Sequence, residues 1–270
     1  MNSNLMLINA PTTPIEWIDQ GFDITPVNPN TKKPVLGLRI WPDFKCTLKD
    51  FNGHKSRALK LDDYTDLDID NPKAKLFIEK YLKFYGARYG RKGNLRSHYL
   101  FKNKSNMTVF DMPKNLEKYC KGYPHGNHLG QIRSGNKYLS IVPGALNKTE
   151  LVEWDKYIGI DKYDGDLEKD FAKIMLSTAL TLCYPERKDQ NDYCFAIACI
   201  LVDNTKWSNE EIDEFVFEIA VQSGDINSRD RMLKGTISRN SEKNKIGLDM
   251  ITKIIGTDKI SIISLFRWIN

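Results

Sequence analysis

The chain has 270 residues, enough for one large domain or two modest ones, and its 41% hydrophobic and 28% charged residues are ordinary for a folded globular protein. No apolar run is long enough to span a membrane and no signal-peptide pattern is present, so we expect no membrane association. Five irregularly spaced cysteines favour reduced thiols in a cytoplasmic protein over a disulfide framework.

Basic residues are concentrated in one part of the chain. From Asn71 to Tyr138 there are fifteen Lys and Arg but three acidic residues, although the net charge of the whole chain is only +5. Such a block can neutralise the phosphates of a polyanion, and the aromatic residues within it can stack on bases. An ordinary solvated basic face is the alternative.

The first part of the chain has the pattern of a mixed α/β domain over about residues 1–160. The expected elements are a Thr-capped helix from Pro14 to Gly21, strands at Phe22–Val27, Ala58–Asp70, Ser97–Phe101 and Gly130–Pro143, and a helix at Lys73–Phe84. The segment Gly130–Pro143 contains Gly135, which predicts a hairpin with a glycine turn.

The pattern becomes helical after an acidic, linker-like stretch at Asp161–Asp170. We expect helices at Phe171–Leu182 and Asp192–Val202, one opened by the capping box Ser208–Glu211, a basic one from Ser228, and a short one at Ile251–Ile255. The second domain is therefore predicted to be a small all-α helix bundle over about residues 165–255.

The segment Asp66-Leu67-Asp68-Ile69-Asp70 has the sharpest chemical pattern. Side chains two apart in a strand share a face, so the three carboxylates would line one side of it. Carboxylates arranged in this way can hold one or two divalent cations for phosphoryl transfer. A polar edge strand is the alternative.

A second motif places a histidine at the start of an apolar strand. His98 directly follows Ser97, and Arg91 lies a few residues upstream. An imidazole in this position can hydrogen-bond the phosphates of a nucleotide. The alternative for His98 is a purely structural role, as an ordinary hairpin is for Gly130–Pro143.

The order of these motifs resembles the primase-polymerase family of the archaeo-eukaryotic primases, which plasmids and viruses encode. That family has a Gly-aromatic strand and a Lys-x-Pro-like turn, here Gly21–Val27 and Lys32–Pro34. An Asp-x-Asp strand, a Ser-x-His-like strand and an acidic-apolar-Arg strand follow. The helical part from Glu186 to Glu211 resembles the family's C-terminal helix bundle.

The resemblance implies an α+β fold, with an RRM-like sheet and a flanking α/β unit in the catalytic domain, followed by the bundle. It also implies a DNA primase and polymerase that synthesises primers and extends them with NTPs or dNTPs along a single-stranded DNA template, by nucleotidyl transfer with two divalent cations. Relatives often continue into a helicase, so a helicase domain or protein is an expected partner.

The resemblance also implies roles for individual residues. Asp68-Ile69-Asp70 matches the acidic pair, which would hold Mg²⁺ or Mn²⁺, and Asp66-x-Asp68 is an alternative register. Ser97-His98 matches the nucleotide-binding motif without its middle residue. The expected nucleotide-binding residues are Ser97, His98, Arg91 and Arg133, and the expected template-binding residues on the basic helix are Arg229, Arg231 and Lys234.

Gln131 departs from the family pattern, which has a third metal-binding carboxylate immediately before the Ile132-Arg133 pair. An amide is neutral and therefore a poorer ligand for Mg²⁺. Weakened catalysis, a substitute acid such as Asp111, a shifted alignment and a deliberate inactivating change are all open. An inactive primase-like replication initiator that only binds DNA, and a metal-dependent nuclease, are the alternative functions.

Cys120, His125 and His128 lie between the second and third motifs. Cys and His are zinc ligands, but zinc takes four ligands and this group has three. Some relatives carry zinc in this insert, so Zn²⁺ is the weaker of the two cofactor hypotheses. A polar loop without metal is the alternative.

Overall fold

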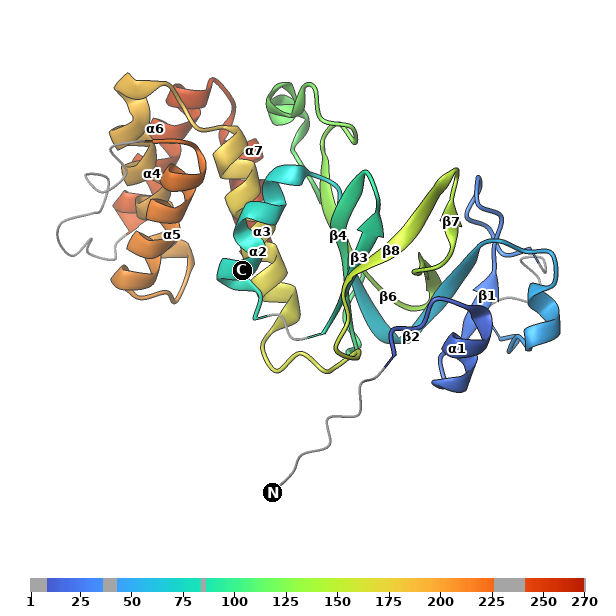
Figure 1. Ribbon diagram of the computed structural model, residues 1–270. Coiled ribbons are helices and arrows are strands. Elements are labelled where there is room, and N and C mark those ends of the chain that lie inside the picture. The colour runs from blue at the N-terminus through green and yellow to red at the C-terminus, as the bar shows by residue number, and fades with distance from the viewer. Residues whose placement is uncertain (1–8, 36–42, 84–85, 226–240, 270) are drawn as a thin grey trace. The chain divides into compact units, whose positions relative to one another are not determined.

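The computed structural model describes residues 9–35, 43–83, 86–225 and 241–269 (Figure 1). The chain is an α+β protein that divides into two compact units. Unit 1 comprises Met1–Ile69, Lys83–Val109 and Gln131–Glu168, and unit 2 comprises Asp70–Leu82, Phe110–Gly130 and Lys169–Asn270. Two segments that the sequence pattern places in the first domain, Asp70–Leu82 and Phe110–Gly130, thus belong to unit 2.

An eight-stranded sheet has the order β5-β6-β2-β4-β3-β8-β7, and β1 pairs with β2. The strands are β1 (Ile24–Pro26), β2 (Arg57–Ile69), β3 (Ala87–Arg91), β4 (Asn94–Phe101), β5 (Thr108–Asp111), β6 (His128–Ile141), β7 (Leu146–Asn147) and β8 (Glu150–Lys156). The pairings β1–β2, β2–β4, β3–β4, β3–β8 and β7–β8 are antiparallel.

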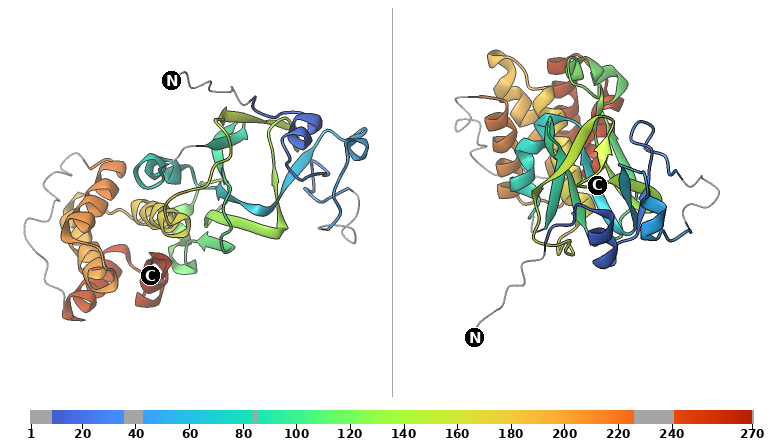
Figure 2. Two further views of the ribbon diagram at one scale, coloured as in Figure 1. Left: turned by 90° about the horizontal axis from the view of Figure 1, so that it is seen from below. Right: turned by 45° about the vertical axis from the view of Figure 1, so that its right-hand side comes forward.

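The strands of unit 1 curl around a hydrophobic core (Figure 2). Trp17, Tyr89, Leu100 and Val142 belong to this core, and each is 0% exposed. Trp17 comes from the helix α1 (Pro14–Asp19), where Thr13 forms the predicted cap as part of a capping box. Ala58, Leu59 and Leu61 of β2 belong to the same core.

The predicted hairpin at Gly130–Pro143 is wrong, because a single long strand, β6, covers most of that segment. Gly135 lies within it with a φ of 94°. The Arg133 guanidinium reaches the Leu139 carbonyl at 3.4 Å, six residues away. Six residues of straight strand span roughly 20 Å, so β6 bends sharply at this glycine.

Unit 2 is mainly helical. Its helices are α2 (Lys75–Tyr81), α3 (Leu167–Leu182), α4 (Gln190–Asn204), α5 (Asn209–Gln222), α6 (Ser241–Ile255) and α7 (Lys259–Phe266). Helices α4 and α6 pack closely, since a Cβ added at Gly247 would meet the Ala196 carbonyl oxygen at 2.6 Å. The buried Tyr193 hydroxyl donates to the Leu180 carbonyl at 2.8 Å and links α4 to α3.

The helical pattern of the sequence agrees with α3, α4 and α5, including the capping box at Ser208 and Glu211. Helix α6 is longer than the predicted Ile251–Ile255, and α7 was not predicted. The predicted basic helix from Ser228 lies outside the described residues.

Gly144→Ala is expected to lower the free energy of unfolding by about 3–5 kcal/mol. Gly144 has a φ of 81°, and an added Cβ would overlap the Thr12 carbonyl, which also accepts a hydrogen bond from Arg57. Urea denaturation would measure the effect. Gly53→Ala is the matched control, because Gly53 has a φ of 77° with open space around it, so only backbone strain of about 1–2 kcal/mol is expected. Equal losses at the two positions would contradict the overlap.

Candidate active site

Three neighbouring strands of unit 1 bring together residues from the three predicted motifs. β2 lies between β6 and β4, and Asp68 of β2 pairs with His98 of β4. Asp66 and Asp68 share a face because side chains alternate along a strand. Gln131 and Arg133 of β6 contact this pair from the other side. The expected acidic, histidine and Gln131-Ile132-Arg133 motifs therefore converge on one face.

Asp66 is the buried anchor of this cluster. It is 0% exposed, and its Oδ2 accepts hydrogen bonds from Arg133 Nη2 and Ser140 Oγ, each at 2.5 Å. Burial alone would raise the pKa of Asp66, but the Arg133 guanidinium, His98 and the Ser140 hydroxyl outweigh it and hold the pKa below the usual range. Asp66 is therefore ionised.

Asp68 is the more accessible carboxylate, with a side chain that is 14% exposed. Its Oδ2 accepts a hydrogen bond from Gln131 Nε2 at 3.1 Å and lies 3.2 Å from Arg133 Nη2. Its Oδ1 lies 3.5 Å from His98 Nδ1. Asp68 is thus the carboxylate of the cluster that a ligand can reach.

His98 lies against both carboxylates. Burial lowers the pKa of the imidazole. The negative charges of Asp68 and Asp66 raise it by a larger amount, so the net shift of the pKa is upward. Tyr89 stacks on the ring, with centroids 5.0 Å apart and planes 14° apart. The ring is therefore held on one face and at one nitrogen.

The resemblance implies two divalent cations, and this face fits one of them. Asp68 and the amide oxygen of Gln131 are suitable ligands, because Mg²⁺ takes one or two carboxylates together with waters and substrate phosphates. A second cation does not fit, since the oxygens of buried Asp66 already accept from Arg133, Ser140 and His98. Within the described residues, no three His, Cys, Asp or Glu side chains are grouped so that they could hold a metal ion.

Asp70 belongs to a different group of side chains, in unit 2. Its carboxylate lies 3.1 Å from His128 Nε2 and 3.5 Å from His125 Nδ1. The other nitrogen of His128 lies 2.6 Å from Asp111 Oδ1. The hydrogen bond to Asp70, together with that to Asp111, raises the pKa of His128 to about 9 despite its burial. His128 thus bridges the carboxylates of Asp70 and Asp111. Asp111, the substitute acid considered from the sequence, contacts His128 in this group.

The three predicted zinc ligands, Cys120, His125 and His128, lie in unit 2. Cys120 is a free thiol that is only 2% exposed, and burial raises its pKa to about 11. His125 and His128 both face the Asp70 carboxylate. The described contacts of the two histidines are therefore with carboxylates, while the thiol is buried and protonated.

Two of the predicted nucleotide-binding residues lie elsewhere in unit 1. Ser97 is 4% exposed and, as the neighbour of His98 in β4, points to the opposite face of the sheet. Arg91 forms an ion pair with Glu150 at 2.9 Å. The predicted template-binding residues Arg229, Arg231 and Lys234 lie outside the described residues.

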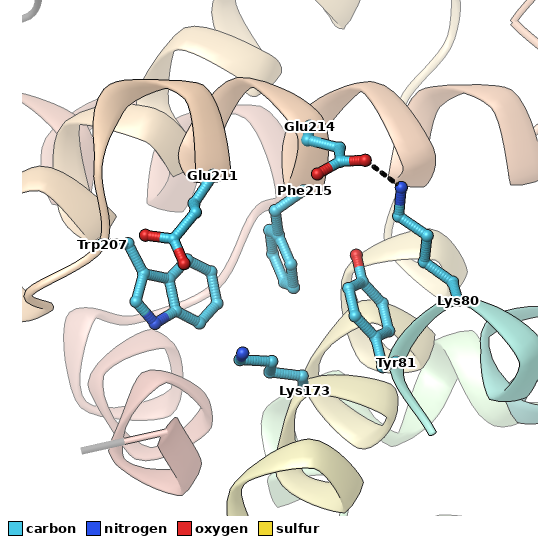
Figure 3. A pocket seen from close by; sticks show the side chains of 7 residues that line it. All are labelled: Lys80, Tyr81, Lys173, Trp207, Glu211, Glu214 and Phe215. Carbon is cyan, nitrogen blue, oxygen red and sulfur yellow. Dashed lines mark hydrogen bonds and ion pairs between the residues drawn. The ribbon is translucent and has the colours of Figure 1, made fainter. Parts of the chain in front are cut away.

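Unit 2 also contains a cavity of about 240 Å³ (Figure 3). The lining side chains are Lys80, Tyr81, Lys173, Trp207, Glu211, Glu214 and Phe215. Lys80 forms an ion pair with Glu214, and the Lys173 ammonium lies 5.1 Å from the centre of the Trp207 ring. Both cations thus have partners among the side chains that line the cavity.

Sequence reasoning missed Tyr89 and Ser140. Tyr89 lies in the basic block and Ser140 in the segment Gly130–Pro143, but the sequence pattern assigned neither residue a role in the site. Comparison with protein-family models and with curated proteins gives no match to this chain. Every helix in the described part of the chain is too short or too polar to serve as a membrane span.

Proposed function

We propose that this chain is a nucleotidyltransferase module of the primase-polymerase type, which binds an NTP or dNTP and adds it to a primer on a single-stranded DNA template. The observation that supports this proposal is the convergence of Asp68, His98 and Gln131 from neighbouring strands. The motif order of the chain and its basic block support the choice of a polyanionic template.

The roles of the residues follow from their surroundings. Asp68 and the side-chain amide oxygen of Gln131 would hold one Mg²⁺ or Mn²⁺. When bound, this cation would neutralise part of the negative charge of the triphosphate. His98 offers its second ring nitrogen, Nε2, to the phosphates. Arg133 adds positive charge, although Asp66 and Asp68 fix its guanidinium in place. The helix bundle would bind the template, and a helicase domain or protein is a proposed partner.

A second candidate function is a primase-like replication initiator that binds DNA without synthesis. Two observations favour it: Gln131 donates a hydrogen bond to Asp68 where the family pattern has a carboxylate, and Asp66 is fully engaged by protein donors. Because the face fits one cation, activation of a primer hydroxyl by a second cation lacks ligands here.

Asp68→Asn is expected to reduce template-directed nucleotide incorporation at least a hundredfold, because it removes the accessible carboxylate of the cluster. A primer-extension assay with Mg²⁺ or Mn²⁺ and mixed NTPs and dNTPs would measure this. Binding of single-stranded DNA should stay unchanged, which separates loss of chemistry from loss of fold.

Asp70→Asn is the matched variant. Asp70 contacts His125 and His128, so a smaller loss is expected than for Asp68→Asn. An equal loss would support the Asp68-Asp70 register of the sequence analysis instead. Product from neither the wild-type chain nor any variant, with DNA still bound, would favour the initiator.

A further inference from the structure

A chain of hydroxyl groups reaches Asp66 from the interior of unit 1. Ser140 Oγ lies 2.5 Å from Asp66 Oδ2 and 2.6 Å from the Tyr89 hydroxyl. Tyr89, Ser140 and Asp66 are all 0% exposed. Buried polar groups need hydrogen-bond partners, and these three find them in one another. Arg133 and Ser140 lie on either side of the bend of β6 at Gly135, and both hydrogen-bond Asp66 Oδ2.

The direction of these hydrogen bonds follows from the chemistry of the groups. An ionised carboxylate only accepts, so Ser140 donates its one hydroxyl hydrogen to Asp66. The Ser140 hydroxyl has no second hydrogen, so in its 2.6 Å contact with Tyr89 the Ser140 oxygen accepts and the Tyr89 hydroxyl donates. The order of donation is therefore Tyr89 to Ser140 to Asp66.

The same carboxylate determines which nitrogen of His98 carries a hydrogen. His98 Nδ1 lies 3.3 and 3.2 Å from the two oxygens of Asp66, and 3.5 Å from Asp68 Oδ1. Because an ionised carboxylate can only accept a hydrogen bond, Nδ1 must carry a hydrogen to bond to Asp66. Arg133 Nη2 also lies 3.2 Å from Nδ1, but it has Asp66 Oδ2 at 2.5 Å and Asp68 Oδ2 at 3.2 Å for its own hydrogens.

Tyr89 also fixes the plane of the imidazole. Its ring stacks on His98 while its hydroxyl supports Ser140, so it acts on the histidine by two routes. Among the described residues, none hydrogen-bonds His98 Nε2. The side chain is 19% exposed, which leaves this nitrogen as the one available to a ligand.

We propose that Ser140 and Tyr89 are positioning residues, which hold Asp66 so that His98 keeps its Nδ1 hydrogen on that carboxylate and presents Nε2 to a phosphate oxygen of a nucleotide. The ligand in this statement rests on the proposed function, whereas the positioning of His98 stands on the contacts alone. Neither residue touches the ligand, and both act through Asp66 and the imidazole.

Proton exchange tests the positioning without any ligand. In the full chain labelled with ¹⁵N-histidine, His98 is expected to give a slowly exchanging Nδ1 proton signal, assigned by its loss in His98→Gln. Ser140→Ala should speed this exchange about tenfold, because the carboxylate loses a buried donor. Ser140→Thr, which keeps the hydroxyl, should restore slow exchange, and Tyr89→Phe should give a smaller increase while retaining the ring stack.

Ser134→Ala is the matched control. Ser134 lies on the same strand, is 6% exposed, and donates to the Tyr64 carbonyl at 2.9 Å, outside the chain of hydroxyls. It should leave the exchange of the His98 proton unchanged. Unchanged exchange in both Ser140→Ala and Tyr89→Phe would overturn the proposal, as would equal acceleration in Ser134→Ala.

Nucleotide affinity tests the second half of the proposal. Ser140→Ala should weaken binding of a fluorescent non-hydrolysable ATP analogue with Mg²⁺ about tenfold in the wild-type background, but should cause no further loss in a His98→Gln background. Equal losses in the two backgrounds would overturn the action through His98. If the wild-type chain binds no nucleotide, the proposed function fails, and the exchange measurement still decides whether Ser140 and Tyr89 position His98.

Discussion

Arg133→Met is expected to lower the free energy of unfolding by about 3–5 kcal/mol, because it leaves the Asp66 carboxylate buried without its cationic partner. Asp66 is 0% exposed, and its Oδ2 lies 2.5 Å from Arg133 Nη2. Methionine keeps most of the side-chain volume, so the loss reports the charge more than a cavity. Urea denaturation monitored by circular dichroism would measure it.

Two further variants make this prediction specific. Lys104→Met breaks the ion pair with Asp63, whose side chains are 76% and 67% exposed, so a loss below about 1 kcal/mol is expected. The double variant Asp66→Leu with Arg133→Met removes both buried charges and should be more stable than Arg133→Met alone. A double variant that is less stable than either single variant would contradict the account of an uncompensated charge.

The sequence predicted the accessible half of the candidate site. Asp66 and Asp68 lie two apart in a strand, so their common face follows from local geometry alone. The neighbouring position of His98 depends on the pairing of β2 with β4, which the sequence pattern did not predict. Tyr89 stacks on His98 because β3 pairs with β4 in a register that places these two residues opposite each other, which a single sequence does not specify. Ser140 lies beyond Gly135, where the sequence pattern predicted a hairpin turn and the structure has one bent strand.

Asp70 shows where local geometry stops being a guide. Alternation placed it on the face of Asp66 and Asp68, but β2 ends at Ile69. The Asp70 amide hydrogen-bonds the Leu129 carbonyl at 3.1 Å, and its carboxylate faces His125 and His128. The end of a strand depends on what its neighbours can still pair with, which a single sequence does not specify.

Gln131→Glu is expected to strengthen Mn²⁺ binding to the free protein at least about tenfold, because it places a carboxylate beside Asp68 where the chain has an amide that donates a hydrogen bond. Two unit charges about 4 Å apart interact by roughly 4 kcal/mol near a protein surface, and the cost of dehydrating the ion offsets part of this gain. Titration followed by electron paramagnetic resonance of free Mn²⁺ would give the two affinities without any nucleotide or template.

Gln131→Met is the control for the lost hydrogen bond, since it removes the donor to Asp68 without adding charge. If Mn²⁺ binds this variant as weakly as the wild-type chain, the gain in Gln131→Glu belongs to the new carboxylate. If Gln131→Met gains as much, the Gln131 amide itself blocks the cation by occupying Asp68. Equal binding by all three proteins would contradict a cation site at Asp68, whose carboxylate lies 3.2 Å from the Arg133 guanidinium.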